Sequence, residues 1–334
     1  MRIKIAYITL GCKLNYAETS TYERELSKAG FEAVPWSKGA DVFVVNTCTV
    51  TEHSDKKSRN IIRKLHRQNP HARIFVTGCS AQLRRADYEA IEGVVRVFGA
   101  TEKSLVVPYI IQNTSGTDCC GHDISTFFPA YSSGERTRSF LKVQDGCDYK
   151  CHYCTVPYAR GESRNIPIAD IIPQAEAIAA EGIKEIVLTG VNTGDFGKST
   201  GETFFELIKQ LNEVEGIERY RISSIEPNLL TEDMIDWIVT GTKFLPHYHI
   251  PLQSGCDTIL KEMGRRYDTA AFAHKIQYIR EKTEVPGGPK VFFGIDVIVG
   301  FPGETDELFM ETYNFLNDVV KPAFIHIFPY SRRA

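Results

Sequence analysis

Gly-Cys-Asp-Tyr-Lys-Cys-His-Tyr-Cys, residues 146–154, is the stretch of sequence from which the fold is predicted. Its three cysteines are Cys147, Cys151 and Cys154, with the spacing C-x3-C-x2-C. Three thiolates this close cannot form two disulfides, but they can bind one face of an iron–sulfur cluster. Three protein ligands for four irons would leave one iron open to a small molecule. The alternative is a zinc site with a fourth ligand elsewhere, as in a non-enzymatic RNA-binding module.

The composition is that of an ordinary enzyme. The chain has 334 residues, 43% of them hydrophobic, which is enough for two domains with full cores. A net charge of −3 gives no global sign of nucleic-acid binding. No apolar run approaches the roughly 18 residues of a membrane span, and the first residues indicate a strand, not a signal peptide. Nine cysteines without a secretion signal fit metal ligands in a reducing cytoplasm better than disulfides.

Short β-branched or aromatic runs alternate with helical stretches in the N-terminal part of the chain. The expected strands are residues 3–9, 42–46, 74–77 and 94–98. The expected helices are about residues 16–29, 54–68 and 84–91. This order predicts an α/β domain of residues 1–112, an open parallel sheet with helices on both faces.

A cysteine follows each of the first three strands: Cys12, Cys48 and Cys79. Because the carboxyl ends of parallel strands share one edge of a sheet, we expect these three side chains to converge. One such cysteine would fit a small core residue, but three at equivalent strand ends predict a second cluster with an open iron. Cys119 and Cys120 lie in a turn-rich linker, residues 113–138, and we expect these adjacent residues to bind no metal.

Residues 139–334 predict a partial (βα)6 barrel. The expected strands are residues 140–143, 185–189, 220–223, 248–250, 291–299 and 324–328, separated for the most part by helical stretches. Six units are too few for a closed eight-stranded barrel. The first strand leads into the C-x3-C-x2-C loop, so the loops after the other strands share its mouth. His247 and His249 alternate on one strand and share a face; we expect a core or cofactor-contacting role, with a metal pair as the alternative.

A basic helix gives a local sign of a polyanion. It starts at Ser54, a good N-cap, close to Cys48. Four cations recur along it at three- and four-residue steps and form one stripe: Lys56, Arg59, Arg63 and Arg67. Most such stripes are only solvated faces, but this position predicts contacts to nucleic-acid phosphates. Arg160 and Arg164, after the cysteine loop, extend the set.

Taken together, the motifs resemble those of the methylthiotransferases, a family of radical S-adenosylmethionine (SAM) enzymes. The resemblance covers essentially the whole chain. The matching motifs are Asn-Thr-Cys-Thr-Val-Thr at 46–51, Thr-Gly-Cys at 77–79, the run 144–157, Arg-Gly at 160–161, Pro-Leu-Gln-Ser-Gly at 251–255 and Gly-Phe-Pro-Gly-Glu-Thr at 300–305.

The resemblance implies two 4Fe–4S clusters and SAM. The auxiliary cluster would be bound by Cys12, Cys48 and Cys79, and the SAM cluster by Cys147, Cys151 and Cys154. The expected SAM contacts lie at the barrel mouth: Tyr153, Gly190, Asn192, Glu226, His249, Gln253 and Asp296. One SAM would give a methyl group to a sulfur on the auxiliary cluster, and a second would be cleaved reductively to activate the substrate carbon.

Within the family, the 46–51 motif and Lys-Ser-Arg at 57–59 look most like the MtaB branch. That branch adds a methylthio group to carbon 2 of N6-threonylcarbamoyladenosine, next to the anticodon in tRNA. Sister branches act on isopentenyladenosine in tRNA or on an aspartate of a ribosomal protein. The implied partners are the tRNA anticodon loop, an external electron donor such as flavodoxin or ferredoxin, and a sulfur donor.

The threonylcarbamoyl group carries a carboxylate, which predicts an arginine partner. The candidates by sequence are Arg160, Arg164, Arg265 and Arg266. The family normally continues into a TRAM-type RNA-binding domain. Because this chain stops before it, straight after an apolar run, we expect a truncated chain.

Overall fold

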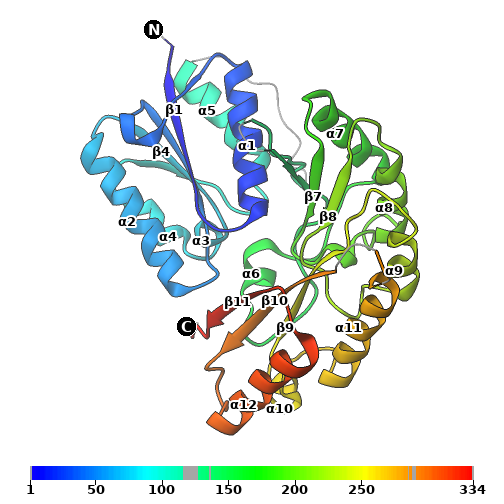
Figure 1. The fold of residues 1–334 in the computed structure, drawn as a ribbon. Helices are drawn as coiled ribbons and strands as arrows, with labels where there is room; N and C mark the ends of the chain where they lie inside the picture. The colour runs from blue at the N-terminus through cyan, green and yellow to red at the C-terminus, as the bar shows by residue number, and fades with distance from the viewer. Residues whose placement is uncertain (1, 116–126, 135–136, 285, 288–290, 333–334) are drawn as a thin grey trace.

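The computed structural model describes residues 2–115, 127–134, 137–284, 286–287 and 291–332. It contains two α/β halves packed side by side (Figure 1). The N-terminal half holds one sheet and its helices, and the C-terminal half holds a curved wall of strands with helices on its outside. Among the described residues, no helix combines the length and the apolar character that crossing a membrane requires.

The N-terminal sheet is entirely parallel, with the strand order β2-β1-β3-β4-β5. Its strands are β1 (Lys4–Thr9), β2 (Glu32–Ala33), β3 (Val42–Thr47), β4 (Arg73–Gly78) and β5 (Val94–Val97). The helical segments of this half are α1 (Lys13–Lys28), η1 (Trp36–Lys38), α2 (Glu52–Gln68), α3 (Cys79–Leu83), α4 (Arg85–Glu89), η2 (Lys103–Leu105) and α5 (Val106–Ser115).

Alternation along β3 gives this sheet two apolar faces. Val42 and Val44 pack with α1 and α5, whereas Phe43 and Val45 pack with α2 and α4. Both faces are buried, which is why the first four residues of the strand, Val42 to Val45, are all apolar rather than alternating with polar residues.

Six parallel strands form the wall of the C-terminal half, as two three-stranded sheets, β6-β7-β8 and β9-β10-β11. The strands are β6 (Ser139–Lys142), β7 (Glu185–Thr189), β8 (Arg219–Ile222), β9 (His247–Gln253), β10 (Phe292–Val299) and β11 (Phe324–Pro329). The helical segments are α6 (Val156–Arg160), α7 (Ile168–Ala180), η3 (Thr193–Asp195), α8 (Phe204–Glu213), α9 (Glu232–Ile238), α10 (Asp257–Glu262), α11 (Thr269–Thr283), α12 (Asp306–Asn314) and the π-helical turn η4 (Phe315–Val320).

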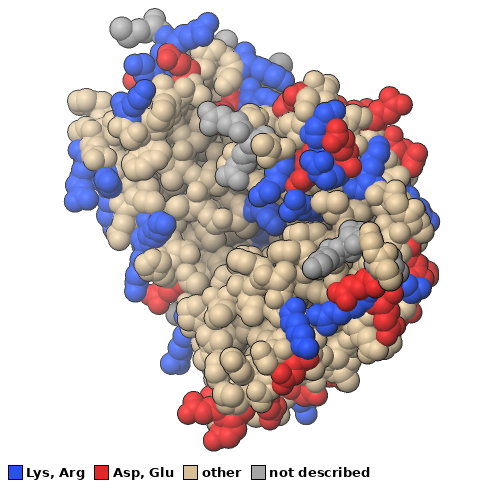
Figure 2. Space-filling model, in the orientation of Figure 1, with Lys and Arg blue, Asp and Glu red and all other residues tan. Residues whose placement is uncertain are grey.

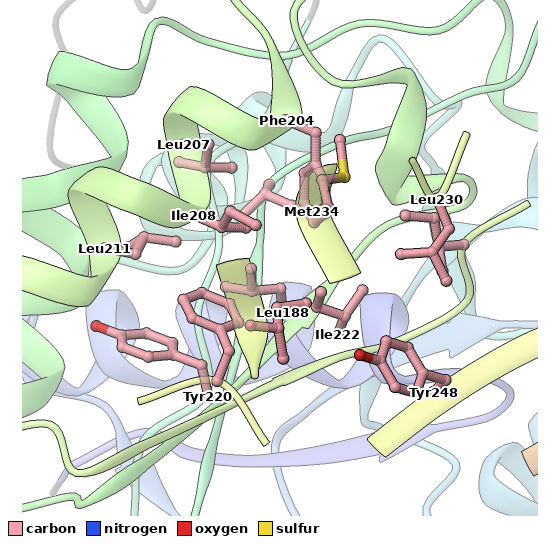
Figure 3. Close-up of a cluster of buried hydrophobic side chains, with 14 of the residues drawn as sticks. Leu188, Phe204, Leu207, Ile208, Leu211, Tyr220, Ile222, Leu230, Met234 and Tyr248 are labelled. Atoms are coloured by element: carbon pink, nitrogen blue, oxygen red, sulfur yellow. The ribbon is translucent and has the colours of Figure 1, made fainter. Parts of the chain in front are cut away.

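One apolar core spans both sheets of this wall. Figure 3 shows part of it, where Leu207 and Leu211 of α8 face Leu188, Ile222 and their neighbours on the strands. β8 and β9 are joined where the backbone N–H of Ile225 donates to the carbonyl of His249, at 3.2 Å. The six strands therefore form the open barrel that the sequence predicts.

Helix α1 closes the open side of the barrel next to β6. Tyr16 packs edge-on against Phe140 of β6, with ring centroids 5.8 Å apart. Ala17 belongs to the same apolar cluster as Phe140 and Val187. The N-terminal half is thus seated on the barrel through the helix that follows its first cysteine.

The predicted and observed elements differ at a few places. Helix α5 ends at Ser115, three residues beyond residue 112, where the N-terminal domain was predicted to end. Its last turn is polar, so the apolar pattern did not indicate that the helix includes these residues. The N-cap of α2 is Thr51, whose hydroxyl accepts a hydrogen bond from the Ser54 N–H, so the prediction of Ser54 as the N-cap was wrong. The division at residues 112 and 139 stays a prediction, and Cys119 and Cys120 lie outside the described residues.

Candidate active site between two sets of cysteines

The loop after β6 carries Cys147, Cys151 and Cys154, and backbone contacts fix its shape. The Cys147 N–H donates to the carbonyl of Gly161 at 3.0 Å, and the Cys154 N–H donates to that of Cys151 at 3.0 Å. Gly146 has φ +76°, and a Cβ there would lie 1.9 Å from the carbonyl oxygen of Glu162. Only glycine fits this turn, so the backbone determines where the first cysteine projects.

The three strand-end cysteines converge, as the topology predicts. Cys12 caps α1, Cys48 follows β3 and Cys79 begins α3. Gly11, with φ +103°, approaches Cys48 so closely that a Cβ on Gly11 would lie 2.8 Å from the Cys48 Sγ. The Asn15 amide holds two of these strand ends together, because it donates to the carbonyls of Leu10 at 2.8 Å and Thr47 at 3.0 Å.

The six thiols suit cluster ligation better than zinc. All six are free cysteines. In a tetrahedral zinc site the sulfurs would lie about 3.8 Å apart, given Zn–S bonds of about 2.3 Å. Within the described part of the chain, neither set of three sulfurs gathers within 4.8 Å. Three thiolates at a wider spacing are the donor set of a cubane cluster.

Burial raises the pKa of four of these thiols and so favours their protonated form when no metal is bound. It raises the pKa of Cys48 and of Cys154 to about 11, and that of Cys147 to about 12. The pKa of Cys79 is also raised by burial, although Arg160 opposes the shift. Metal binding at either site must therefore release protons, as it does when thiols become thiolate ligands.

Each cysteine set has its own buried arginine, which donates a hydrogen bond to one of the sulfurs. The Nε of Arg160 lies 3.2 Å from the Sγ of Cys79, and the Nη1 of Arg265 lies 3.2 Å from the Sγ of Cys151. Hydrogen bonds of this kind stabilise negative charge on a cluster and raise its reduction potential.

Three of the four arginines expected to bind a substrate carboxylate are already engaged, which corrects that prediction. Arg160 pairs with Glu18 and Asp145, and Arg265 pairs with Glu226. Both guanidinium side chains are only 2% exposed. Arg164 pairs with Asp145 at 3.2 Å and also donates to main-chain carbonyls.

The role predicted for Arg266 stays a prediction. It is exposed and lies over the Tyr149 ring, 3.7 Å from the ring centroid.

A network of buried ions joins the two halves. The interdomain ion network consists of Glu18, Lys103, Lys142, Asp145 and Arg160, each with a side chain at most 2% exposed. Glu18 lies 2.8 Å from Lys103, 3.0 Å from Lys142 and 3.1 Å from Arg160. Burial alone would raise the pKa of Glu18, but these three cations hold it well below its usual range.

Glu18 was not predicted from the sequence. A signal was present, because Glu18 falls at four-residue steps between Leu14 and Tyr22, on the buried face of α1. A charged residue in such a row indicates a buried partner.

Two neighbouring cavities lie beside the cysteine sets. The first, about 170 Å³, is lined by Cys154, Tyr153, Gln253 and Asp296. The second, about 530 Å³, is lined by Cys12 and Cys48, and Asp296 belongs to its wall as well. Because the cavities also share Val50, Thr51 and Phe328, Cys154 of one set and Cys12 and Cys48 of the other face one common region.

The expected SAM contacts divide between these two places. Tyr153, Gln253 and Asp296 line the first cavity with Cys154, and Gly190 and His249 line the second. Gln253 has φ +69°, a strained conformation for a residue with a side chain, and such strain clusters at functional sites.

Asn192 and Glu226 line neither cavity. Asn192 is buried, and within the described structure neither atom of its side-chain amide has a partner.

Asp296 is held by two histidines. His249 Nε2 lies 2.8 Å and His326 Nδ1 lies 3.0 Å from its Oδ1. His247, which was predicted to share a face with His249, stacks on Phe292 with ring centroids 4.7 Å apart. His326 was not predicted, because the last strand was recognised by its apolar residues alone.

The basic stripe on α2 is only partly free. Lys56 pairs with Glu52 at 3.0 Å, and Arg59 turns toward Asp87 at 3.5 Å with 17% of its side chain exposed. Arg63 and Arg67 are exposed. Figure 2 shows Lys and Arg side chains along the outer edge of the N-terminal half, where Figure 1 places α2. The phosphate-binding role of these residues stays a prediction.

Comparison with known proteins matches both halves. Residues 4–99 match the uncharacterized protein family UPF0004, and residues 141–316 match the radical SAM superfamily. The chain is 41% identical to the threonylcarbamoyladenosine tRNA methylthiotransferase MtaB of Bacillus subtilis, over 98% of this chain and 74% of that protein. It is 35% identical to the protein of that name from Aquifex aeolicus, over 99% of this chain and 81% of that protein.

Two further similarities are more distant. The tRNA-2-methylthio-N(6)-dimethylallyladenosine synthase of Helicobacter pylori is 32% identical, over 99% of this chain and 76% of that protein. Among solved structures, the radical SAM methyltransferase TsrM of Kitasatospora setae has a TM-score of 0.66 at 13% identity, covering 97% of this chain and 72% of that one. The similarity to TsrM concerns the fold alone.

Proposed function

The chain belongs to the methylthiotransferases of the radical SAM superfamily, and from this we propose that it adds a methylthio group to carbon 2 of N6-threonylcarbamoyladenosine in tRNA. The observation that carries the proposal is that members of both three-cysteine sets, Cys154 of one and Cys12 and Cys48 of the other, line adjoining cavities between the halves. A methylthiotransferase needs two such sites, because radical generation and delivery of sulfur are separate tasks. The match to relatives that share this activity supports the choice of substrate.

The chain's own residues position the reactants. When bound, the SAM cluster supplies the electron that cleaves SAM, and the auxiliary cluster supplies a site for the transferred sulfur. We assign the SAM side to the first cavity, where Tyr153, Gln253 and Asp296 stand beside Cys154. Arg265 orders this wall, because it donates both to the Tyr153 hydroxyl at 3.1 Å and to the Cys151 sulfur.

The remaining expected SAM contacts belong to the same proposal. Asn192 offers an unpartnered buried amide, and Glu226 is positioned by Arg265. Gly190 and His249 stand where the second cavity meets the barrel mouth.

The substrate base must leave its stack to reach a site between two domains, at a cost of a few kcal/mol. A base in a loop meets this requirement more easily than a base in a duplex. We propose that exposed Lys56, Arg63 and Arg67 of α2 contact anticodon-arm phosphates, and that Arg59, turned toward Asp87, contributes less.

The reaction needs two further partners. These are an external one-electron donor such as flavodoxin or ferredoxin and a source of sulfur. Because tRNA and free thiols are found together in the reducing cytoplasm, we propose that the protein acts in that compartment.

The test is a methylthiolation assay with the anaerobically reconstituted protein. tRNA from cells lacking this activity is incubated with protein, SAM and reductant, and its nucleosides are analysed by mass spectrometry. We expect 2-methylthio-N6-threonylcarbamoyladenosine. A methylthio product on isopentenyladenosine alone, or on a ribosomal protein alone, would assign the chain to a sister branch.

A further inference from the structure

Lys13 is placed differently from the other buried cations of the site. It is the first residue of α1, directly after Cys12, and it lines the cavity of about 530 Å³ between the cysteine sets. Its side chain is half-buried. Among the residues that the structure describes, no hydrogen bond or ion pair engages its ammonium group. By contrast, Lys103, Lys142 and Arg160 all pair with carboxylates.

Lys13 lies among charges of both signs but has no ion-pair partner among the described residues. Arg138 and Arg221 act on it as further positive charges, whereas Asp296 and the neighbouring Cys12 act in the opposite sense. Asp296 already accepts from both His249 and His326. A partly desolvated ammonium with no dedicated anion is costly, so a bound anion at this position would be stabilised.

We propose that Lys13 binds the carboxylate of the threonylcarbamoyl group and so selects this substrate over bases that carry an uncharged N6 group. The inference rests on the proposed function, because it takes the carboxylate from that substrate. It differs from the sequence-based expectation of an arginine, for which Arg266 remains a candidate, since Arg160, Arg164 and Arg265 are engaged within the protein.

The position of Lys13 favours the substrate over other anions. Lys13 lies on the Cys12 and Cys48 side, whereas the cavity with Cys154, assigned to SAM, does not include it. Hydroxyls of Ser223 and Ser224 line the same cavity as Lys13 and offer additional donors. A carboxylate here would hold the base directly beside the auxiliary cysteines, where sulfur must be delivered.

The test compares two anticodon stem–loops that differ only in charge. One carries N6-threonylcarbamoyladenosine and the other its threonine methyl ester, which is neutral. Kd and methylthiolation kcat/KM are measured with reconstituted wild-type, Lys13→Met, Lys13→Arg and Lys28→Met proteins. Lys28 is an exposed lysine at the other end of α1, outside both cavities, and serves as the matched control.

We expect the wild type and Lys28→Met to prefer the acid over the ester by about 10- to 100-fold, as for a charge-assisted hydrogen bond. In Lys13→Met this preference should fall to about one, and Lys13→Arg should keep most of it. The ratio compares two ligands on the same protein, so a partial loss of iron next to Cys12 cancels. Kd gives the ratio even if a variant is inactive.

Three results would overturn the inference. They are an unchanged ratio in Lys13→Met, an equal loss of affinity for both stem–loops with a lower salt slope, and a wild type that does not distinguish acid from ester. The second result would assign Lys13 to a phosphate contact. A wild type that binds the acid preferentially but methylthiolates neither stem–loop would contradict the proposed function, while the assignment of Lys13 would stand.

Discussion

Replacing Glu18 by Gln tests whether the interdomain ion network joins the two halves. The substitution keeps the shape of the side chain but leaves Lys103, Lys142 and Arg160 with Asp145 as the one remaining carboxylate of the network. Because Glu18 is 0% exposed, the lost attraction is poorly replaced by water. Removing one partner of a buried ion pair costs about 3–5 kcal/mol, which corresponds to a fall in Tm on the order of 10 °C.

The assay is thermal and urea unfolding, with Glu89→Gln as the control. Glu89 pairs with Arg85 at 2.9 Å on an exposed helix surface, and its loss should cost about 0.5 kcal/mol or less. Since Glu18 joins α1 to β6 and α6, its replacement should also separate unfolding into two transitions. A fall in Tm no larger than that of Glu89→Gln would refute the reasoning.

The same substitution predicts a pH dependence. Burial would raise the pKa of Glu18, but its three cations hold that pKa below the usual range. Its stabilisation is therefore complete above about pH 4.5 and declines as the pH falls toward the lower folded pKa, because the unfolded chain takes up the proton first. The Tm difference between wild type and Glu18→Gln should narrow from about pH 5 to about pH 3. A difference that widens in acid would contradict this sign.

Three further predictions concern the cysteines and Arg265. Replacing Cys147, Cys151 and Cys154 together by Ala should lower the iron content from about eight to about four per chain, since the other set remains; loss of all iron, or of none, would show that the two sites are not independent. Cys48→Ala should still cleave SAM to 5′-deoxyadenosine but form no methylthio product, and normal product formation would exclude the auxiliary set as the sulfur site. Arg265→Gln should lower the reduction potential of the SAM cluster by tens of millivolts, which is the order expected when a hydrogen bond to a ligand sulfur is lost. The potential is measured by a redox titration monitored by electron paramagnetic resonance. An unchanged potential would limit Arg265 to a packing role.

Local pattern was enough to predict most of the fold. Each of the ten strands expected from the sequence is present, because β-branched runs and turn residues are local signals. The convergence of Cys12, Cys48 and Cys79 was also predictable, since it follows from the rule that parallel strands end at one edge. Short helices such as α3, α6 and α10 were missed because five or six residues are too few to show a helical period.

The charge pairing could not be predicted from the sequence. The partner of Arg160 is Glu18, which lies 142 residues earlier in the chain, and no local motif connects them. The sequence does not distinguish the four arginines near the mouth, yet three of them pair with carboxylates and one lies over a tyrosine ring. Lys13 was not predicted, because what distinguishes it is that its ammonium group has no ion-pair or hydrogen-bond partner among the described residues. That property exists only in the folded chain.

The contact between Arg160 and Cys79 has a consequence for how the protein matures. The interdomain ion network holds three cations and two anions, and Arg164 brings a further cation to Asp145, so without metal positive charge is in excess there. Burial keeps the neighbouring Cys79 thiol neutral in that state. Conversion of this thiol to a thiolate by a metal centre would place negative charge 3.2 Å from Arg160. We therefore expect loading of the auxiliary site to reduce the excess positive charge at the joint between the halves and to strengthen their docking.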